Sequence, residues 1–191
     1  MRRLLLTPVL IAFLAVSATP LAAQDTPHSN RSGFWIDIGL GGGSLGFSVS
    51  DGVEIDSETG FSGNLSLGGT LSPKVQLGGG TMGWTKSDAG TGGALLAIVN
   101  WFPSATGDVY LRGGLGFFTY SETDLGFEFS VSSAAMMVGV GYDFMVSSNI
   151  GITPYFNFLY AAKSEIKIDG TGSGIDASST LAQLGVALSI N

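Results

Sequence analysis

The segment Met136-Met-Val-Gly-Val-Gly-Tyr-Asp-Phe144 carries the pattern from which the fold is predicted. Its odd-numbered positions hold a methionine, two glycines and an aspartate, and its even-numbered positions hold only bulky apolar residues. Apolar residues at every second position are typical of a β-strand with one apolar face, whereas a helix repeats them every three to four positions. This stretch therefore predicts a strand.

The same alternation recurs along the chain downstream of Gly33. It is clear over residues 34–41, 61–71, 109–117, 152–160 and 184–190. Two further segments, about 74–86 and 93–102, cannot be assigned a face from their periodicity, because Leu95-Leu-Ala-Ile-Val99 is a continuous apolar run. Together these segments predict eight strands and no helix.

The connections between these segments alternate in length. Residues 72–74, 103–108 and 147–149 are short connections, and residues 49–59, 87–92, 122–133 and 164–179 are the intervening, mostly longer ones. Short turns on one side and longer loops on the other are typical of an up-and-down barrel whose ends face different compartments.

The placement of charge predicts which strand face is outside. Asp37, Arg112 and Asp143 are the charges of the strand mid-sections, and all three lie on the face opposite the apolar residues, together with many glycines. A water-soluble barrel, such as a secreted lipocalin-like binder of hydrophobic ligands, would carry many charges on that face. A membrane barrel turns its apolar face to lipid. We therefore predict an eight-stranded antiparallel up-and-down transmembrane β-barrel over residues 33–191.

Composition excludes several other classes. The chain has 191 residues, a net charge of −7, a pI near 4.4 and no cysteine. So acidic a protein offers no electrostatic footprint for nucleic acid. The absence of cysteine excludes disulfides, thiolate metal sites and a cysteine nucleophile.

The first 23 residues predict a secretory signal peptide. Met1-Arg-Arg3 is a short basic segment, the residues to Val16 are mostly apolar, and Ala22-Ala23 offers a cleavage site. The apolar run is too short for a membrane-spanning helix. Residues 24–32 are polar, and we expect them to form a flexible periplasmic lead-in to the barrel.

Aromatic residues gather near both ends of the predicted strands. Rings at the two membrane–water boundaries form girdles in membrane barrels. The residues that we expect in these girdles are Trp35, Trp84, Trp101, Tyr110, Phe118, Tyr120, Phe144, Tyr155 and Tyr160.

Five segments carry a family resemblance: Gly33-Phe-Trp-Ile-Asp-Ile-Gly-Leu-Gly41, Trp101-Phe-Pro103, Tyr110-Leu-Arg-Gly-Gly-Leu-Gly116, Val138-Gly-Val-Gly-Tyr-Asp143 and the alternating last strand. Through them, and over residues 33–191, the chain resembles the small bacterial outer-membrane β-barrels typified by the membrane domain of OmpA and by OmpX. The resemblance implies a monomer in the outer membrane of a Gram-negative bacterium, with both termini in the periplasm. The implied partners are membrane lipid, lipopolysaccharide and the insertion machinery, which reads the last strand. That strand ends in Ser189-Ile-Asn191 rather than in the aromatic residue usual for the family.

The sequence predicts no catalytic residue, cofactor or metal site. Enzymatic outer-membrane barrels generally use a histidine as base, and the one histidine, His28, lies in the lead-in. Asp51-Gly-Val-Glu-Ile-Asp-Ser-Glu58 places four acids in eight residues, but it lacks the EF-hand spacing and is better explained as a solvated acidic loop.

A polar network is the site that we predict inside the barrel. An arginine in a narrow interior needs a partner, because an unpaired buried charge is costly. We expect Arg112 to pair with Asp143 on the adjacent strand and also to approach Asp37. The remaining members of the network are Asn64, Gln76, Asn100, Asn157 and Gln183.

The predicted role is non-enzymatic: a structural or surface-interaction protein that acts through its extracellular loops, with an unknown extracellular partner. The main alternative is a narrow channel or transporter for small solutes.

Overall fold

The computed structural model describes residues 31–49, 53–87, 90–124 and 126–191. The predicted signal peptide and residues 24–30 of the lead-in lie outside the described residues. The strands are β1 (Phe34–Val49), β2 (Val53–Ser72), β3 (Val75–Thr85), β4 (Thr91–Trp101), β5 (Val109–Asp124), β6 (Phe127–Tyr142), β7 (Phe144–Met145), β8 (Ile150–Ile168) and β9 (Thr171–Ile190). In the described part of the chain, no helix is both long and apolar enough to span a bilayer.

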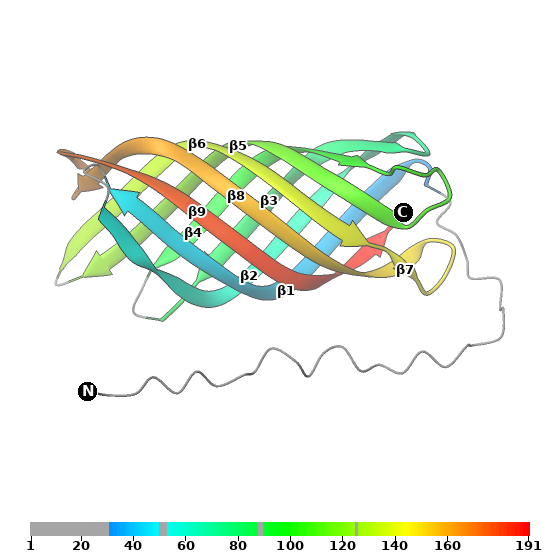
Figure 1. The fold of residues 1–191 in the computed structure, drawn as a ribbon, viewed down its shortest axis with the longest axis horizontal. Helices are drawn as coiled ribbons and strands as arrows, with labels where there is room; N and C mark the ends of the chain where they lie inside the picture. The colour runs from blue at the N-terminus through cyan, green and yellow to red at the C-terminus, as the bar shows by residue number, and fades with distance from the viewer. Residues whose placement is uncertain (1–30, 50–52, 88–89, 125) are drawn as a thin grey trace.

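The sheet closes on itself. Each long strand pairs antiparallel with its neighbours along the chain, β1 also pairs with β9, and β6 pairs with β8. The two residues of β7 extend the pairing along β8. The result is a closed eight-stranded antiparallel barrel of tilted strands, which confirms the predicted fold class (Figure 1).

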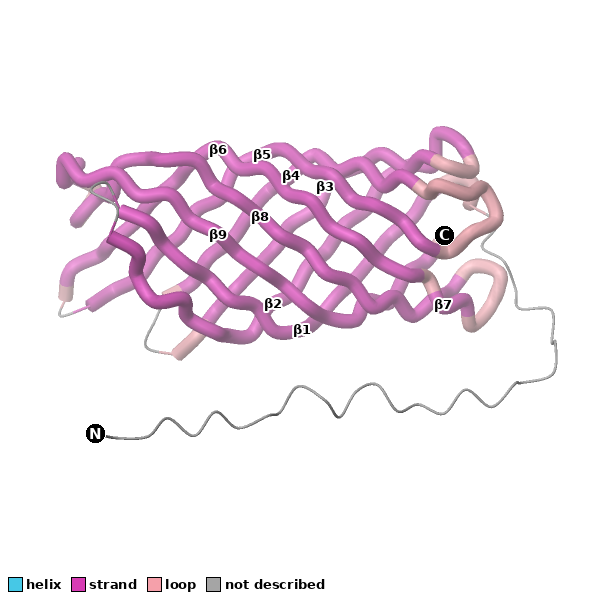
Figure 2. Tube along the Cα trace, in the orientation of Figure 1, coloured by secondary structure: helices cyan, strands magenta, loops and turns pink. Residues whose placement is uncertain are grey.

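The two ends of the barrel differ (Figure 2). We call the end that holds β7 and Asn191 the terminus end, and the opposite end the hairpin end. At the terminus end the strands are joined by short turns, as predicted. At the hairpin end, β1 and β2 pair as far as Val49 and Val53, and β5 and β6 pair as far as Asp124 and Phe127.

The longer loops predicted at the hairpin end are mostly strand, so this expectation is wrong. Residues 53–59, 127–133 and 171–179 all belong to strands. Their sequences did not indicate strands, because both faces of a hairpin that projects from a membrane can be polar. Backbone hydrogen bonds between the two strands form without an alternation of apolar and polar residues. Three of the four connections at this end are therefore projecting β-hairpins: β1–β2, β5–β6 and β8–β9.

The apolar faces of the strands form the outer wall. Leu65, Val138 and Val186 are 41%, 62% and 53% exposed, whereas Asp37, Arg112 and Asp143 are 7%, 4% and 4% exposed. On β6 the outward apolar positions run from Ala134 to Tyr142, nine residues, which matches the 9–11 residues of a transmembrane strand. The outward face therefore has the height and character of a surface that contacts lipid.

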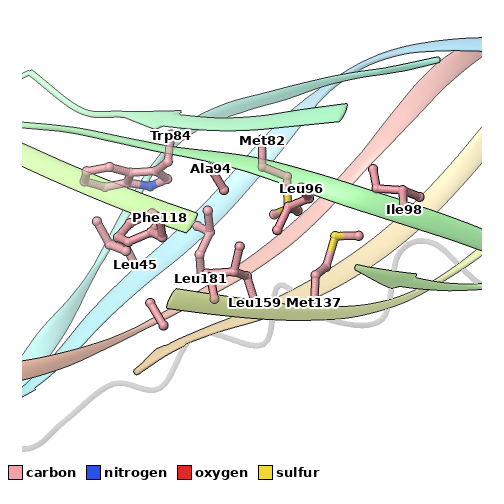
Figure 3. Close-up of a cluster of buried hydrophobic side chains, with 12 residues drawn as sticks. Leu45, Met82, Trp84, Ala94, Leu96, Ile98, Phe118, Met137, Leu159 and Leu181 are labelled. Atoms are coloured by element: carbon pink, nitrogen blue, oxygen red, sulfur yellow. The ribbon is translucent and has the colours of Figure 1, made fainter. Parts of the chain in front are cut away.

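The interior has two layers. Nearer the terminus end, the inward side chains include both polar residues and the rings of Trp35, Phe102, Tyr110 and Tyr155. Nearer the hairpin end, they form an apolar cluster of Leu45, Met82, Trp84, Ala94, Leu96, Ile98, Phe118, Ala135, Met137, Leu159, Ala161 and Leu181. Figure 3 shows these side chains converging from the surrounding strands. The sequence did not predict this apolar layer, because apolar residues were assigned to the outer wall.

Candidate functional site

Arg112 is the centre of the polar layer. Its Nη2 donates a hydrogen bond of 2.5 Å to Oδ2 of Asp37, and its Nε donates one of 2.7 Å to Oδ1 of Asn100. Asn100 donates in turn to Oε1 of Gln76 at 3.2 Å, and Gln76 donates to Oδ1 of Asn191 at 2.8 Å. One chain of hydrogen bonds thus connects β1, β5, β4 and β3 to the C-terminal residue.

The expected pair between Arg112 and Asp143 does not form; the partner is Asp37. Arg112 stands in register with Gly139, so Asp143 lies four residues nearer the terminus end. There its Oδ1 accepts a 2.8 Å hydrogen bond from Oγ1 of Thr153, whose hydroxyl lies 2.7 Å from that of Ser189. Asp37 instead reaches Arg112 from the other side of the narrow interior.

Two of the remaining predicted members, Asn157 and Gln183, form a separate group. Nδ2 of Asn157 donates to Oε1 of Gln183 at 3.1 Å, and Nε2 of Gln183 donates to the carbonyl oxygen of Gly63 at 3.1 Å. Asn64 is buried but takes no part in either chain of bonds. The hydrogen-bonded polar residues therefore lie in separate local groups rather than in the single network that we expected.

Arg31 lies across the terminus end, although the sequence places it in a flexible lead-in. It is 5% exposed, and its guanidinium lies 3.6 Å from the ring centroid of Phe102. Its Nη2 donates at 2.5 Å to the carbonyl oxygen of Gly107, and its Nη1 donates at 3.3 Å to that of Ala105. Burial lowers the pKa of Arg31, while the carboxylates of Asp143 and Asp108 oppose that shift. Arg31 thus fixes the turn between β4 and β5.

Most of the predicted girdle residues point into the barrel, so this part of the prediction is wrong. Trp35, Trp84, Tyr110, Phe118 and Tyr155 are 0–3% exposed, and Tyr120 lines an interior pocket. The rings fit because glycines face them: a Cβ at Gly39 would lie 2.7 Å from the ring of Tyr155, and one at Gly92 would lie 3.0 Å from that of Phe118. Trp101, Phe144 and Tyr160 are 47%, 57% and 41% exposed, and a girdle role for them remains a prediction.

A pocket of about 370 Å³ opens at the hairpin end, above the apolar layer. Leu45 and Trp84 belong both to the pocket and to that layer, while Phe47, Tyr120 and Phe129 form aromatic walls. Asp56 and Glu58, which we expected in a solvated loop, line this pocket together with Glu122. The described residues contain no group of three or more side chains placed to hold a metal ion.

Comparisons with known proteins identify the fold. Neither a protein-family model nor a curated protein matches the sequence. Among solved structures, the chain is similar to Neisserial surface protein A, with 17% identity and a TM-score of 0.61 over 83% of this chain and 97% of that one. It is also similar to the outer membrane protein OprG of Pseudomonas aeruginosa, with 12% identity and a TM-score of 0.50 over 85% and 98% of the two chains. The chain therefore has the fold of the small outer-membrane β-barrels, as the resemblance in its sequence implied.

Proposed function

We propose that this protein is a non-enzymatic outer-membrane barrel with both termini in the periplasm and its hairpins at the cell surface, where it has a structural or surface-interaction role. The observation that carries the proposal is the packed interior. The polar layer and the apolar layer fill the barrel beneath the pocket at the hairpin end, so its accessible features are its outer wall, its projecting hairpins and that pocket.

The orientation is supported by the contrast between the two ends. Membrane barrels have short periplasmic turns and longer extracellular segments. The connections of residues 72–74 and 147–149 are short, while three hairpins extend the opposite end. Beyond the apolar band, the outward positions of β5 become Thr119, Ser121 and Thr123, which suit an aqueous surface.

The orientation can be tested on intact cells with an amine-reactive reagent that does not cross the outer membrane. Lys167 is exposed on the β8–β9 hairpin, and Lys74 is exposed at the turn between β2 and β3. We expect mass spectrometry to find Lys167 modified in intact cells and Lys74 modified only after permeabilisation. The reverse pattern would place the hairpins in the periplasm and contradict the proposal.

The non-transporting role can be tested by conductance in planar bilayers. Because the side chains of the two interior layers pack against one another across the barrel, we expect no steady open state. A general porin is the positive control. A stable ohmic current from the purified protein would instead favour the narrow channel.

The implied partners follow from the location. The outer wall would contact membrane lipid and lipopolysaccharide, and the insertion machinery would assemble the barrel as a monomer. The expected absence of catalysis rests on the sequence argument that the barrel region contains no histidine.

A further inference from the structure

The pocket at the hairpin end has aromatic and aliphatic walls. Phe47 of β1 and Tyr120 of β5 meet edge to face with their ring centroids 4.7 Å apart. Val131 and Ile166 add aliphatic surface from β6 and β8. With Trp84 of β3 and Ala177 of β9, six strands contribute to one concave apolar surface, and its volume of about 370 Å³ is within the range of small-molecule sites.

The same pocket is acidic. Its described lining carries three carboxylates, Asp56, Glu58 and Glu122, and no basic side chain. Within the described part of the chain, Lys86 forms an ion pair with Glu58 at the opening of the pocket. Three carboxylates against one ammonium leave an excess of negative charge around an apolar cavity.

One acid is held in place against an aromatic wall. The hydroxyl of Tyr120 donates a 2.9 Å hydrogen bond to Oε2 of Glu122. Burial, together with Glu122, raises the pKa of Tyr120, so the phenol stays protonated and continues to donate. Glu122 therefore presents its charge beside the rings that line the cavity.

The pocket is closed below. Leu45 and Trp84 form its floor, at 1% and 2% exposed, and Leu181 lies in the same apolar layer. Trp84 is fixed there by a 3.0 Å hydrogen bond from Nε1 to the carbonyl oxygen of Gly43. A molecule that enters from the hairpin end would stay in the pocket rather than pass through the barrel.

From this combination we propose that the pocket binds a small organic cation, an ammonium group carried on an apolar body. The apolar body would lie on the floor and against the aliphatic walls, and the ammonium group would lie among Asp56, Glu58 and Glu122. Aromatic rings add attraction for a cation placed over their faces. An anion of the same size would be repelled by the carboxylates.

The proposal goes beyond the surface role, because binding in the pocket depends neither on the orientation of the barrel nor on a macromolecular partner. It can be tested in nanodiscs of phosphatidylcholine with three probes of one size: benzylammonium, benzyl alcohol and benzoate. We expect calorimetry to show saturable binding of one benzylammonium per barrel. Benzyl alcohol should bind about tenfold more weakly and benzoate more weakly still.

Variants locate the site. Glu122→Gln should weaken benzylammonium binding about fivefold, and Phe47→Leu should weaken it about threefold, because each removes an attraction for the cation and keeps most of the volume. Glu128→Gln is the matched control, since Glu128 is an exposed acid of β6 outside the pocket lining. This control should bind as the native protein does.

Three outcomes would overturn the proposal. Equal binding of benzylammonium and benzyl alcohol would show that the carboxylates do not select a cation. If Glu122→Gln and Glu128→Gln weaken benzylammonium binding equally, the effect comes from the general surface charge and not from the pocket. An absence of saturable binding would exclude the site. Since none of these outcomes depends on lysine accessibility or conductance, each leaves the proposed function standing.

Discussion

Arg112 and Asp37 are joined by a 2.5 Å hydrogen bond inside the barrel, although 75 residues separate them in the chain. Their side chains are 3% and 10% exposed. A charge pair in this position can tie β1 to β5 across the interior, with strands β2 to β4 lying between them in the barrel wall.

Replacement of Arg112 should therefore be costly. Arg112→Leu leaves the carboxylate of Asp37 buried without its partner, and removal of one member of a buried pair typically costs about 3–5 kcal/mol. Urea unfolding from lipid vesicles measures the change. Lys86→Gln is the control, because its ion pair with Glu58 is exposed and should contribute at most about 1 kcal/mol. An unchanged unfolding midpoint for Arg112→Leu would show that the pair does not stabilise the barrel.

The apolar layer should behave as a packed core. Leu96 points inward and is 2% exposed. Leu96→Ala should destabilise the barrel by about 2–5 kcal/mol, because it creates a cavity among Met82, Ile98 and Met137. Leu96→Met keeps the volume and should cost less than about 1.5 kcal/mol. Equal stabilities of the two variants in the same unfolding experiment would mean that the layer is loosely packed.

Gly116 should tolerate no side chain. A Cβ at this position would overlap the carbonyl oxygen of Leu95 on the neighbouring strand. Gly116→Ala should therefore lower stability by about 1–3 kcal/mol or more, because the backbone must move. The comparison is Gly69→Ala, where a Cβ would have no neighbour within 4 Å. The refolding yield in vesicles measures the difference. Equal yields for both variants and the native protein would contradict the expected overlap at Gly116.

Arg31 should hold the turn between β4 and β5. Arg31→Ala removes its bonds to Ala105 and Gly107, so hydrogen exchange over residues 103–108 should become faster. Exchange at the distant β8–β9 turn should stay unchanged and provides the internal control. If residues 103–108 exchange as slowly as in the native protein, the turn does not depend on Arg31.

The sequence predicted the barrel because lipid imposes a simple rule on its outer wall. Val138 and Leu188 face outward and must be apolar, whereas Asp143 and Ser189 face the interior and can be polar. The rule does not determine what fills the interior. Leu95 and Leu96 are both apolar, one outside and one inside, so periodicity could not assign β4 to a face.

The interior contacts depend on stagger and on distances across the barrel, which a sequence does not give. Asp143 directly follows β6, the strand that pairs with β5, but it lies four residues out of register with Arg112. The alternation of inward and outward positions along each strand did contain information about the aromatic residues that the prediction did not use. Tyr110 shares the inward parity of Arg112, and this alone could have removed it from the predicted girdle.

We infer that the apolar side chains of the outer wall contact lipid, while the residues that alternate with them in the sequence point into the barrel. Since the protein has no cysteine, single spin labels at Val138→Cys and Met137→Cys in lipid vesicles test it directly. We expect the label at position 138 to collide with oxygen, which concentrates in the bilayer, and not with a water-soluble nickel complex. The label at position 137 should be shielded from both. Strong collision of the label at 138 with the nickel complex would show that the wall faces water and would contradict the membrane barrel.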